Sequence, residues 1–158
     1  MQLSTALLTS LFATLTLAAP ALRLPTCLNR RQGAPFDTPD RVWTMQQFRR
    51  VCDDSDMNCE WSFTINTHRD FQAPTPCKYS IPALPGVPAS MAEEMGADCG
   101  PFRVVSAWSG QFGPENGFTT LSVIDPEERL VAFPSYSDKQ LEGGKVVVPD
   151  LEFVPHDF

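Results

Sequence analysis

The chain has 158 residues, and its 19 acidic and 12 basic side chains give a formal net charge of −7 at pH 7. An acidic protein repels the phosphate backbone of nucleic acids and anionic lipid surfaces, so this charge argues against both as partners. No apolar run reaches the roughly 18 residues that a membrane-spanning helix needs, so we expect no membrane insertion.

Residues 1–19 have the features of a secretory signal peptide. A short apolar stretch that ends at Leu17 precedes the small residues Ala18 and Ala19, which suit cleavage by signal peptidase. We therefore expect the protein to be secreted and extracellular. No Asn-x-Ser/Thr sequon is present, so we expect no N-glycosylation.

Residues 20–31 are interpreted as a short propeptide that ends in the dibasic processing site Arg30-Arg31. The chain has five cysteines, and an odd number is awkward in a secreted protein. Cleavage after Arg31 would remove Cys27 and leave four cysteines, whereas an uncut chain could use Cys27 in an intermolecular disulfide. The mature chain, residues 32–158, would be a single β domain with a net charge of −10, because the removed segments contain three arginines and no acid.

The four remaining cysteines allow three disulfide connectivities. Pairing of neighbours, Cys52 with Cys59 and Cys77 with Cys99, is favoured because it joins the ends of loops, where the strand ends of a meander lie close together. Two such bridges would add roughly 2–4 kcal/mol each to the stability of a domain of this size.

Short β-type runs separated by proline, glycine and asparagine predict a mainly β fold. The clearest run, residues 61–66, alternates strictly and places Trp61, Phe63 and Ile65 on one face. Residues 125–128 form a predicted turn, with proline at its second position. The other predicted strands are residues 42–48, 78–81, 102–108, 118–124, 129–133 and 145–148. Strands at this spacing in a disulfide-linked chain indicate a compact antiparallel β-barrel or sandwich.

Two short helices are also predicted. Ser90 and Glu93 have the spacing of a capping box, and Gly96 could end that helix in the left-handed conformation. Residues 138–142 could form one further turn, ended by the glycines at 143–144.

An acidic segment offers the first candidate for chemistry. Asp53, Asp54, Asp56 and Glu60 are closely spaced carboxylates of the kind that calcium prefers. The glycine and the distant glutamate of an EF-hand loop are missing, so we interpret the segment as a solvated acidic loop and predict no metal site.

Candidates for catalysis are weaker. His68 and His156 do not lie at metal-ligand spacing from another histidine or a cysteine, and they are far apart in the sequence. Ser109 follows Ala107 and Trp108 rather than the glycine pattern of a nucleophile elbow, so a turn serine is the preferred interpretation. We therefore predict no catalytic residue, no cofactor and no enzymatic activity.

The most distinctive stretch is the aromatic loop, residues 108–118. Its Asn116-Gly117 pair is a strong hairpin-turn signal. Its aromatic side chains could either dock a partner or a carbohydrate ring, or cap one end of the core. If they dock a partner, the candidate contact residues are Trp108, Gln111, Phe112 and Asn116.

Several motifs resemble those of small secreted fungal proteins of the Alternaria major-allergen-like group, with the best resemblance to hypersensitive-response-inducing elicitor-like proteins. The motifs are residues 42–44, 48–50, 52, 59–65, 77, 99–102, 108–113, 117–121 and 143–150. The resemblance implies a compact β-barrel-like fold without a known catalytic site. It also implies secretion by a fungus and perception by plant cells as an elicitor of defence.

The sequence therefore favours an effector that acts by non-catalytic recognition of a host surface receptor or an apoplastic protein. Three alternatives stay open. The first is a secreted hydrolase with a buried carboxylate pair, and the second is a binder of cell-wall polysaccharide or a small ligand. The third is a protease inhibitor that would use residues 53–58 as a rigid, extended loop.

Overall fold

The computed structural model describes residues 41–158. The expected signal peptide, the propeptide with Arg30 and Arg31, and Cys27 lie outside the described residues. The expected start of the mature domain at residue 32 lies outside them as well.

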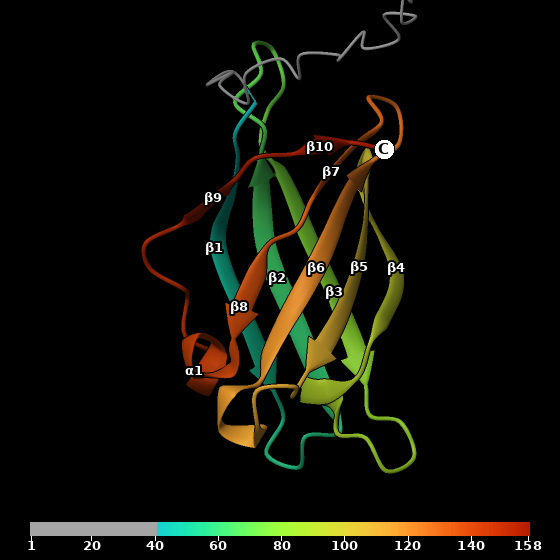
Figure 1. Cartoon of the computed structure of the whole chain (residues 1–158), viewed down its shortest axis with the longest axis vertical. Helices are drawn as coiled ribbons and strands as arrows, with labels where there is room; N and C mark the ends of the chain where they lie inside the picture. The colour runs from blue at the N-terminus through green and yellow to red at the C-terminus, as the bar shows by residue number, and fades with distance from the viewer. Residues whose placement is uncertain (1–40) are drawn as a thin grey trace, which may run out of the picture. The chain divides into compact units, whose positions relative to one another are not determined.

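Within residues 41–158, ten strands build two antiparallel sheets (Figure 1). The first sheet has the order β3-β2-β1-β9, with bounds β1 Trp43–Cys52, β2 Asn58–Asn66, β3 Thr75–Pro82 and β9 Leu151–Phe153. The second has the order β10-β7-β6-β5-β4, and β8 also pairs with β6. Its strands are β4 Glu94–Cys99, β5 Phe102–Ser109, β6 Phe118–Asp125, β7 Leu130–Ala132, β8 Ser135–Ser137 and β10 His156–Asp157. Because the strands of the described part pair into two separate sheets, the sandwich alternative fits and a closed barrel does not.

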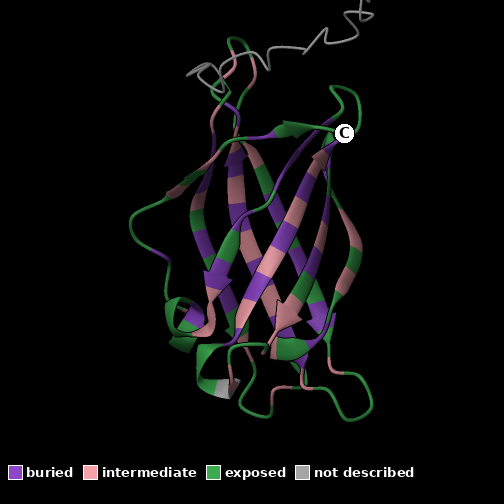
Figure 2. Ribbon diagram, in the orientation of Figure 1, coloured by how far each residue is buried: buried purple, intermediate pink, exposed green. Residues whose placement is uncertain are grey.

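The core lies between the sheets, where period-two alternation turns one face of each strand inward (Figure 2). Phe48 stacks on Tyr136 across the core with ring centroids 3.8 Å apart, and Trp43 meets Phe102 edge to face at 5.4 Å. The predicted inward face of β2 is confirmed, because Trp61, Phe63 and Ile65 are all buried.

The disulfides are Cys52–Cys59 and Cys77–Cys99, so the favoured neighbour pairing is confirmed. Cys52 and Cys59 are directly opposite each other at the ends of β1 and β2. The second bridge joins β3 of one sheet to β4 of the other, and it therefore ties two sheet edges together.

The helix predicted to start near Ser90 was wrong. A single 3₁₀ turn, η1 Ala89–Met91, stands there, and β4 begins at Glu94 after two irregular residues. The Ser90 amide and hydroxyl both donate to the Asp56 carboxylate, so Ser90 is not available to cap a helix. Glu94 instead pairs with Ser106 of β5, and Gly96, at φ 145°, belongs to an irregular stretch of β4.

The short helix predicted near residue 138 is confirmed as α1 Asp138–Leu141, which is followed by the 3₁₀ turn η3 Glu142–Gly144. Ser137 and Gln140 form its capping box, in which the Ser137 hydroxyl accepts a hydrogen bond from the Gln140 amide.

The strand predicted at residues 145–148 was wrong, because this segment runs as irregular chain beside β1. The Val147 amide donates to the Phe48 carbonyl at 2.8 Å, and the Asp150 carboxylate accepts from the Gln47 amide at 2.8 Å. These contacts fall at the bulge of β1, where the ladder is interrupted and Gln47 has a φ of 53°. Pro149 has no amide to donate, so a regular ladder cannot continue through it.

The remaining strand predictions hold, with shifted ends. The hairpin between β5 and β6 is also present, but Asn116-Gly117 does not form its turn. The connection contains the 3₁₀ turn η2 Pro114–Asn116, and Gly117 has a φ of −59°, outside the left-handed region that a two-residue Asn-Gly turn requires. Among residues 41–158, no helix is both long and apolar enough to cross a membrane.

Candidate functional site

Four connecting segments gather at one end of the two sheets, at the bottom of Figure 1. They are residues 53–57, 83–93, 110–117 and 138–144, and we call them together the loop end. Hydrogen bonds link these segments, so the loop end is one connected surface rather than four independent loops.

Asp56 is the main link between the first two segments. Its carboxylate accepts from the amide and the hydroxyl of Ser90, and its carbonyl accepts from the Ala89 amide at 2.9 Å. The Met57 carbonyl accepts from the Ala83 amide at 2.8 Å, and the Cys52–Cys59 disulfide closes the base of the segment. This segment is therefore held in one conformation by the neighbouring loop.

Asp53 organises its own turn. Its carboxylate accepts hydrogen bonds from the Met57 amide at 3.0 Å and from the Ser55 hydroxyl at 2.8 Å. These donors lower the pKa of Asp53 below its ordinary value. Asp53 thus accepts hydrogen bonds from its own turn and Asp56 from Ser90 of the neighbouring segment, so both carboxylates have a structural role. The sequence predicted a solvated acidic loop, and Asp53 and Asp54 are exposed. Asp56 also lies near Cys52 and Cys59, but both sulfurs are in the disulfide and are not free thiolate ligands.

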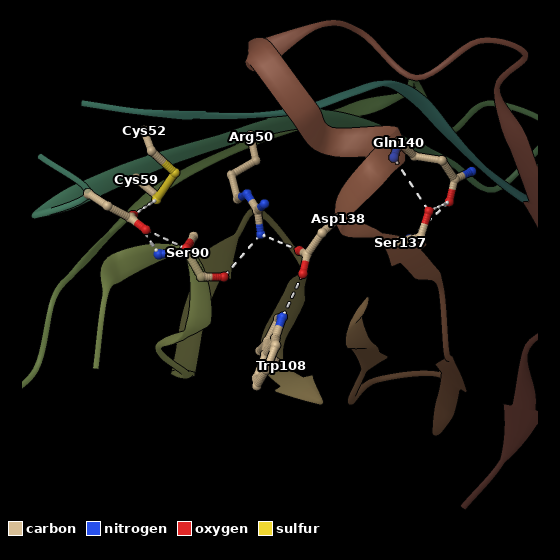
Figure 3. A network of polar contacts seen from close by, with 9 residues as sticks. Arg50, Cys52, Cys59, Ser90, Trp108, Ser137, Asp138 and Gln140 are labelled. Atoms are coloured by element: carbon tan, nitrogen blue, oxygen red, sulfur yellow. Dashed lines mark hydrogen bonds and ion pairs between the residues drawn. A yellow bond between two sulfur atoms is a disulfide. The ribbon is translucent and has the colours of Figure 1, made fainter. Parts of the chain in front are cut away.

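Arg50 is a buried cation that connects several elements at the loop end (Figure 3). The residue is only 8% exposed, and its Nη1 donates to the Ser90 carbonyl at 3.0 Å and to the Asp138 carboxylate at 3.1 Å. Its guanidinium also lies 5.5 Å from the centre of the Trp61 ring. One buried cation thus joins β1, η1 and α1.

Trp108 completes this network. Its indole N–H donates to the Asp138 carboxylate at 2.9 Å (Figure 3). The ring covers Gly110 and Gly117, and a Cβ at either glycine would collide with it. Trp108 is half-buried, so of the two interpretations of the aromatic loop it fits the capping one.

The three other candidate contacts are exposed. Phe112 is 67% exposed and stacks on Phe118 with ring centroids 5.9 Å apart. Asn116 is exposed, and its side-chain amide donates to the Phe112 carbonyl at 3.2 Å, which fixes the loop backbone beneath that ring. Gln111 is exposed as well. The structure therefore separates Trp108, which supports the loop, from the three residues that the loop presents to solvent.

Two hollows flank the acidic segment. The first, the acidic cleft, has a volume of about 940 Å³, and six carboxylates but only two cations, Arg50 and Lys139, line it. The second, the apolar groove, has a volume of about 540 Å³ and runs between residues 55–57 and 83–88. Asp56 lines both, so the two hollows are neighbours.

The weaker candidates for chemistry are not brought together. His68 follows β2, and its Nε2 lies 2.6 Å from the Thr44 hydroxyl, whereas His156 pairs with Val131 in the other sheet. The Ser109 hydroxyl accepts from the Gln111 amide at 3.4 Å, as expected of a turn serine. Neither histidine contacts Ser109.

Sequence reasoning missed Arg50 and Asp138, although both lie at the centre of the loop end. They are 88 positions apart, and nothing local marks either as a buried ion pair. One signal was available: Arg50 falls on the inward side of β1, two positions after buried Phe48, where an arginine needs a partner.

Comparison with known proteins gives the same family twice. The family model "Effector TSP1" matches residues 44–158. The protein "Effector TSP1" of Hypocrea virens (strain Gv29-8 / FGSC 10586) is 37% identical over 155 residues, which cover 98% of this chain and 97% of the relative. Both comparisons support a fungal effector family, and neither names the allergen-like or elicitor-like proteins that the sequence motifs resemble. The chain belongs to the Effector TSP1 family.

Proposed function

We propose that this protein is a secreted fungal effector that plant cells recognise at their surface or in the apoplast, without catalysis by the effector. Family membership supports the effector role. The two disulfides are consistent with an oxidising, extracellular compartment. The response of the plant would be the defence reaction that the resemblance to elicitor-like proteins implies.

The observation that carries the proposal is the presentation of Phe112. A phenyl ring that is 67% exposed stands on a loop whose base is fixed by Trp108, Asp138 and the Asn116 side chain. Aromatic side chains on preorganised supports are typical binding hot spots, because little conformational entropy is lost when a partner covers them. Gln111 and Asn116 would supply the polar contacts around the ring.

The site supports recognition better than catalysis. Of the carboxylates around the acidic cleft, Asp53 and Asp56 are engaged by loop donors, and Asp138 is paired with Arg50. The hydrogen bonds from its own turn lower the pKa of Asp53, whereas a general acid in an apolar pocket needs a raised one. The carboxylates of this cleft therefore act as structural groups and as surface charge.

The test is leaf infiltration with purified protein, secreted by a yeast that expresses the full chain. Phe112→Ala should abolish or strongly reduce the oxidative burst and cell death that the wild type causes. Phe71→Ala is the matched control, because Phe71 is fully exposed on the loop between β2 and β3, at the other end of the strands. A Phe112→Ala protein that folds normally and keeps full activity would refute the proposal.

A further inference from the structure

We infer that the loop end binds a partner protein through a segment in which an apolar side chain adjoins lysine or arginine. The apolar side chain would occupy the apolar groove, and the cationic one the acidic cleft. This inference deepens the proposed function and rests on it for the identity of the partner as a host protein. It concerns a surface different from the Phe112 ring.

The apolar groove is built to receive an apolar side chain. Met57 and Leu84, which line it, are 60% and 53% exposed, and Val87 lies on the same wall. Its wall is rigid, because Leu84 and Val87 exchange backbone hydrogen bonds at 2.9 Å and Met57 is tied to Ala83. Exposed apolar side chains on a fixed backbone favour docking, since burial is gained and little order has to be imposed.

The carboxylates of the acidic cleft determine which kind of partner residue can lie beside the apolar one. With all groups ionised, the acidic cleft has a net charge of −4. Arg50 does not cancel the remaining carboxylates, because its charge is already paired with Asp138. Asp54, Glu115 and Glu142 form no ion pair with another residue of the described part. These three carboxylates would therefore attract a cation from a partner.

The two hollows share Asp56 as a lining residue. The apolar and the basic residue of the partner must therefore lie close together in its sequence. Asp56 itself is held by Ser90, so the residue that the groove and the cleft share has a fixed position. A partner segment that passes over Asp56 could place its apolar side chain in the groove and its basic side chain in the cleft, within a few residues of each other. The lining of the two hollows includes no aromatic residue, so neither offers a ring face to a sugar. A peptide therefore fits this surface better than a polysaccharide does.

The experiment measures the binding of labelled synthetic peptides to the intact protein by fluorescence anisotropy. Four peptides of equal length are compared, which differ only at the apolar and the charged position. These two positions hold leucine and lysine, glycine and lysine, leucine and glutamate, or serine and glycine. The leucine–lysine peptide should bind most tightly. The double variant Asp54→Asn/Glu142→Gln should weaken it by about five- to tenfold, in the range expected for two exposed charge contacts. Leu84→Ser should weaken the leucine–lysine peptide but not the glycine–lysine peptide.

The matched control is Asp70→Asn/Glu127→Gln, which removes the same charge from exposed positions outside the loop end. This control should leave binding unchanged. Equal binding of both lysine peptides, or equal weakening by both double variants, would overturn the inference in favour of unspecific attraction to an acidic protein. Binding of chitosan oligomers that Leu84→Ser does not affect, together with no preference for leucine, would overturn it in favour of a cationic polysaccharide.

Leaf infiltration with the same variants separates this inference from the proposed function. If the wild type binds the peptides selectively but causes no leaf response, the proposed function is refuted and the inferred binding surface is supported. A leaf response that needs Phe112 but no selective peptide binding would remove this inference alone.

Discussion

The two ends of the strands differ in how their charged side chains are paired and in which groups are exposed. At the end opposite the loop end, Arg69 lies 3.6 Å from Asp125 and 3.7 Å from Glu128, and the Arg129 guanidinium binds the Phe158 carbonyl. These two arginines are thus engaged within the chain, whereas Asp70 and Glu127 are exposed and form no ion pair with a described residue. At the loop end, a buried arginine fixes the scaffold while carboxylates and apolar side chains stay exposed around it.

This difference shows what a recognition surface requires beyond exposure. Phe71 at the opposite end is more exposed than Phe112, and its loop is held by the Thr67–Gln72 and Gln72–Arg69 hydrogen bonds and by the ion pairs of Arg69. The Phe112 loop rests on Trp108, which is hydrogen-bonded to Asp138 and through it connected to Arg50. The proposed function places recognition at the loop end, where the exposed Phe112 ring stands on this support.

The largest expected effect comes from the disulfides, which brace the two ends unequally. Replacing Cys77 and Cys99 together by serine should lower the free energy of unfolding by about 3.4 kcal/mol, against about 2.5 kcal/mol for Cys52 and Cys59, because the closed loops span 22 and 7 positions. Urea denaturation of the two double variants measures this. If removal of Cys52–Cys59 lowers the free energy of unfolding more than removal of Cys77–Cys99, the entropy of loop closure does not account for its effect on the loop end.

Removing the buried cation tests the scaffold of the loop end. Arg50→Met should lower the free energy of unfolding by about 2–3 kcal/mol, less than for a fully buried pair because Asp138 is 30% exposed. The control is Arg41→Met, which breaks an exposed pair with Asp157 and should cost less than about 1 kcal/mol. Equal losses in the two variants would mean that Arg50 is not a scaffold residue.

The link between Trp108 and Asp138 should be measurable as a coupling. A double-mutant cycle with Trp108→Phe and Asp138→Ala, followed by urea denaturation, should give a coupling energy of about 1 kcal/mol, as for a partly buried hydrogen bond to a charged group. Strict additivity of the two substitutions would contradict the network.

Alkaline pH should loosen the core rather than either end. Burial raises the pKa of Tyr79 and of Tyr136 well above the ordinary value of 10.0. The unfolded chain therefore releases these protons first, and stability should fall as the pH rises above about 10. Tyr136→Phe should flatten this decline, as measured by urea denaturation at a series of pH values. At neutral pH it should cost little, because the Tyr136 hydroxyl has no hydrogen-bond partner among the described residues. An unchanged pH profile would contradict the buried position.

The fold was predictable from sequence wherever alternation is clean. β2 and β6 show strict alternation of buried and less buried residues, and both were predicted. β4 was missed because its residues, Glu-Met-Gly-Ala-Asp-Cys, alternate poorly around the irregularity at Gly96. Local signals also misled where tertiary contacts overrode them, since Ser90 serves Asp56 rather than a helix.

The candidate site was predictable in composition but not in arrangement. The aromatic loop and the acidic segment both stand out in the sequence. Their connection through Arg50, Asp138 and Ser90 depends on contacts between residues 40 and 88 positions apart, which no local pattern encodes. For the same reason the sequence could not show that Trp108 is half-buried against Asp138 while Phe112 is exposed.

The central claim is that recognition depends on Phe112 at a fixed loop end, and dose–response infiltration of leaves tests it most directly. Wild type, Phe112→Ala and Phe71→Ala are compared at matched concentrations, after circular dichroism and urea denaturation have shown equal folding. We predict that Phe71→Ala matches the wild type while Phe112→Ala loses the oxidative burst and cell death. Equal responses to all three proteins would contradict the account.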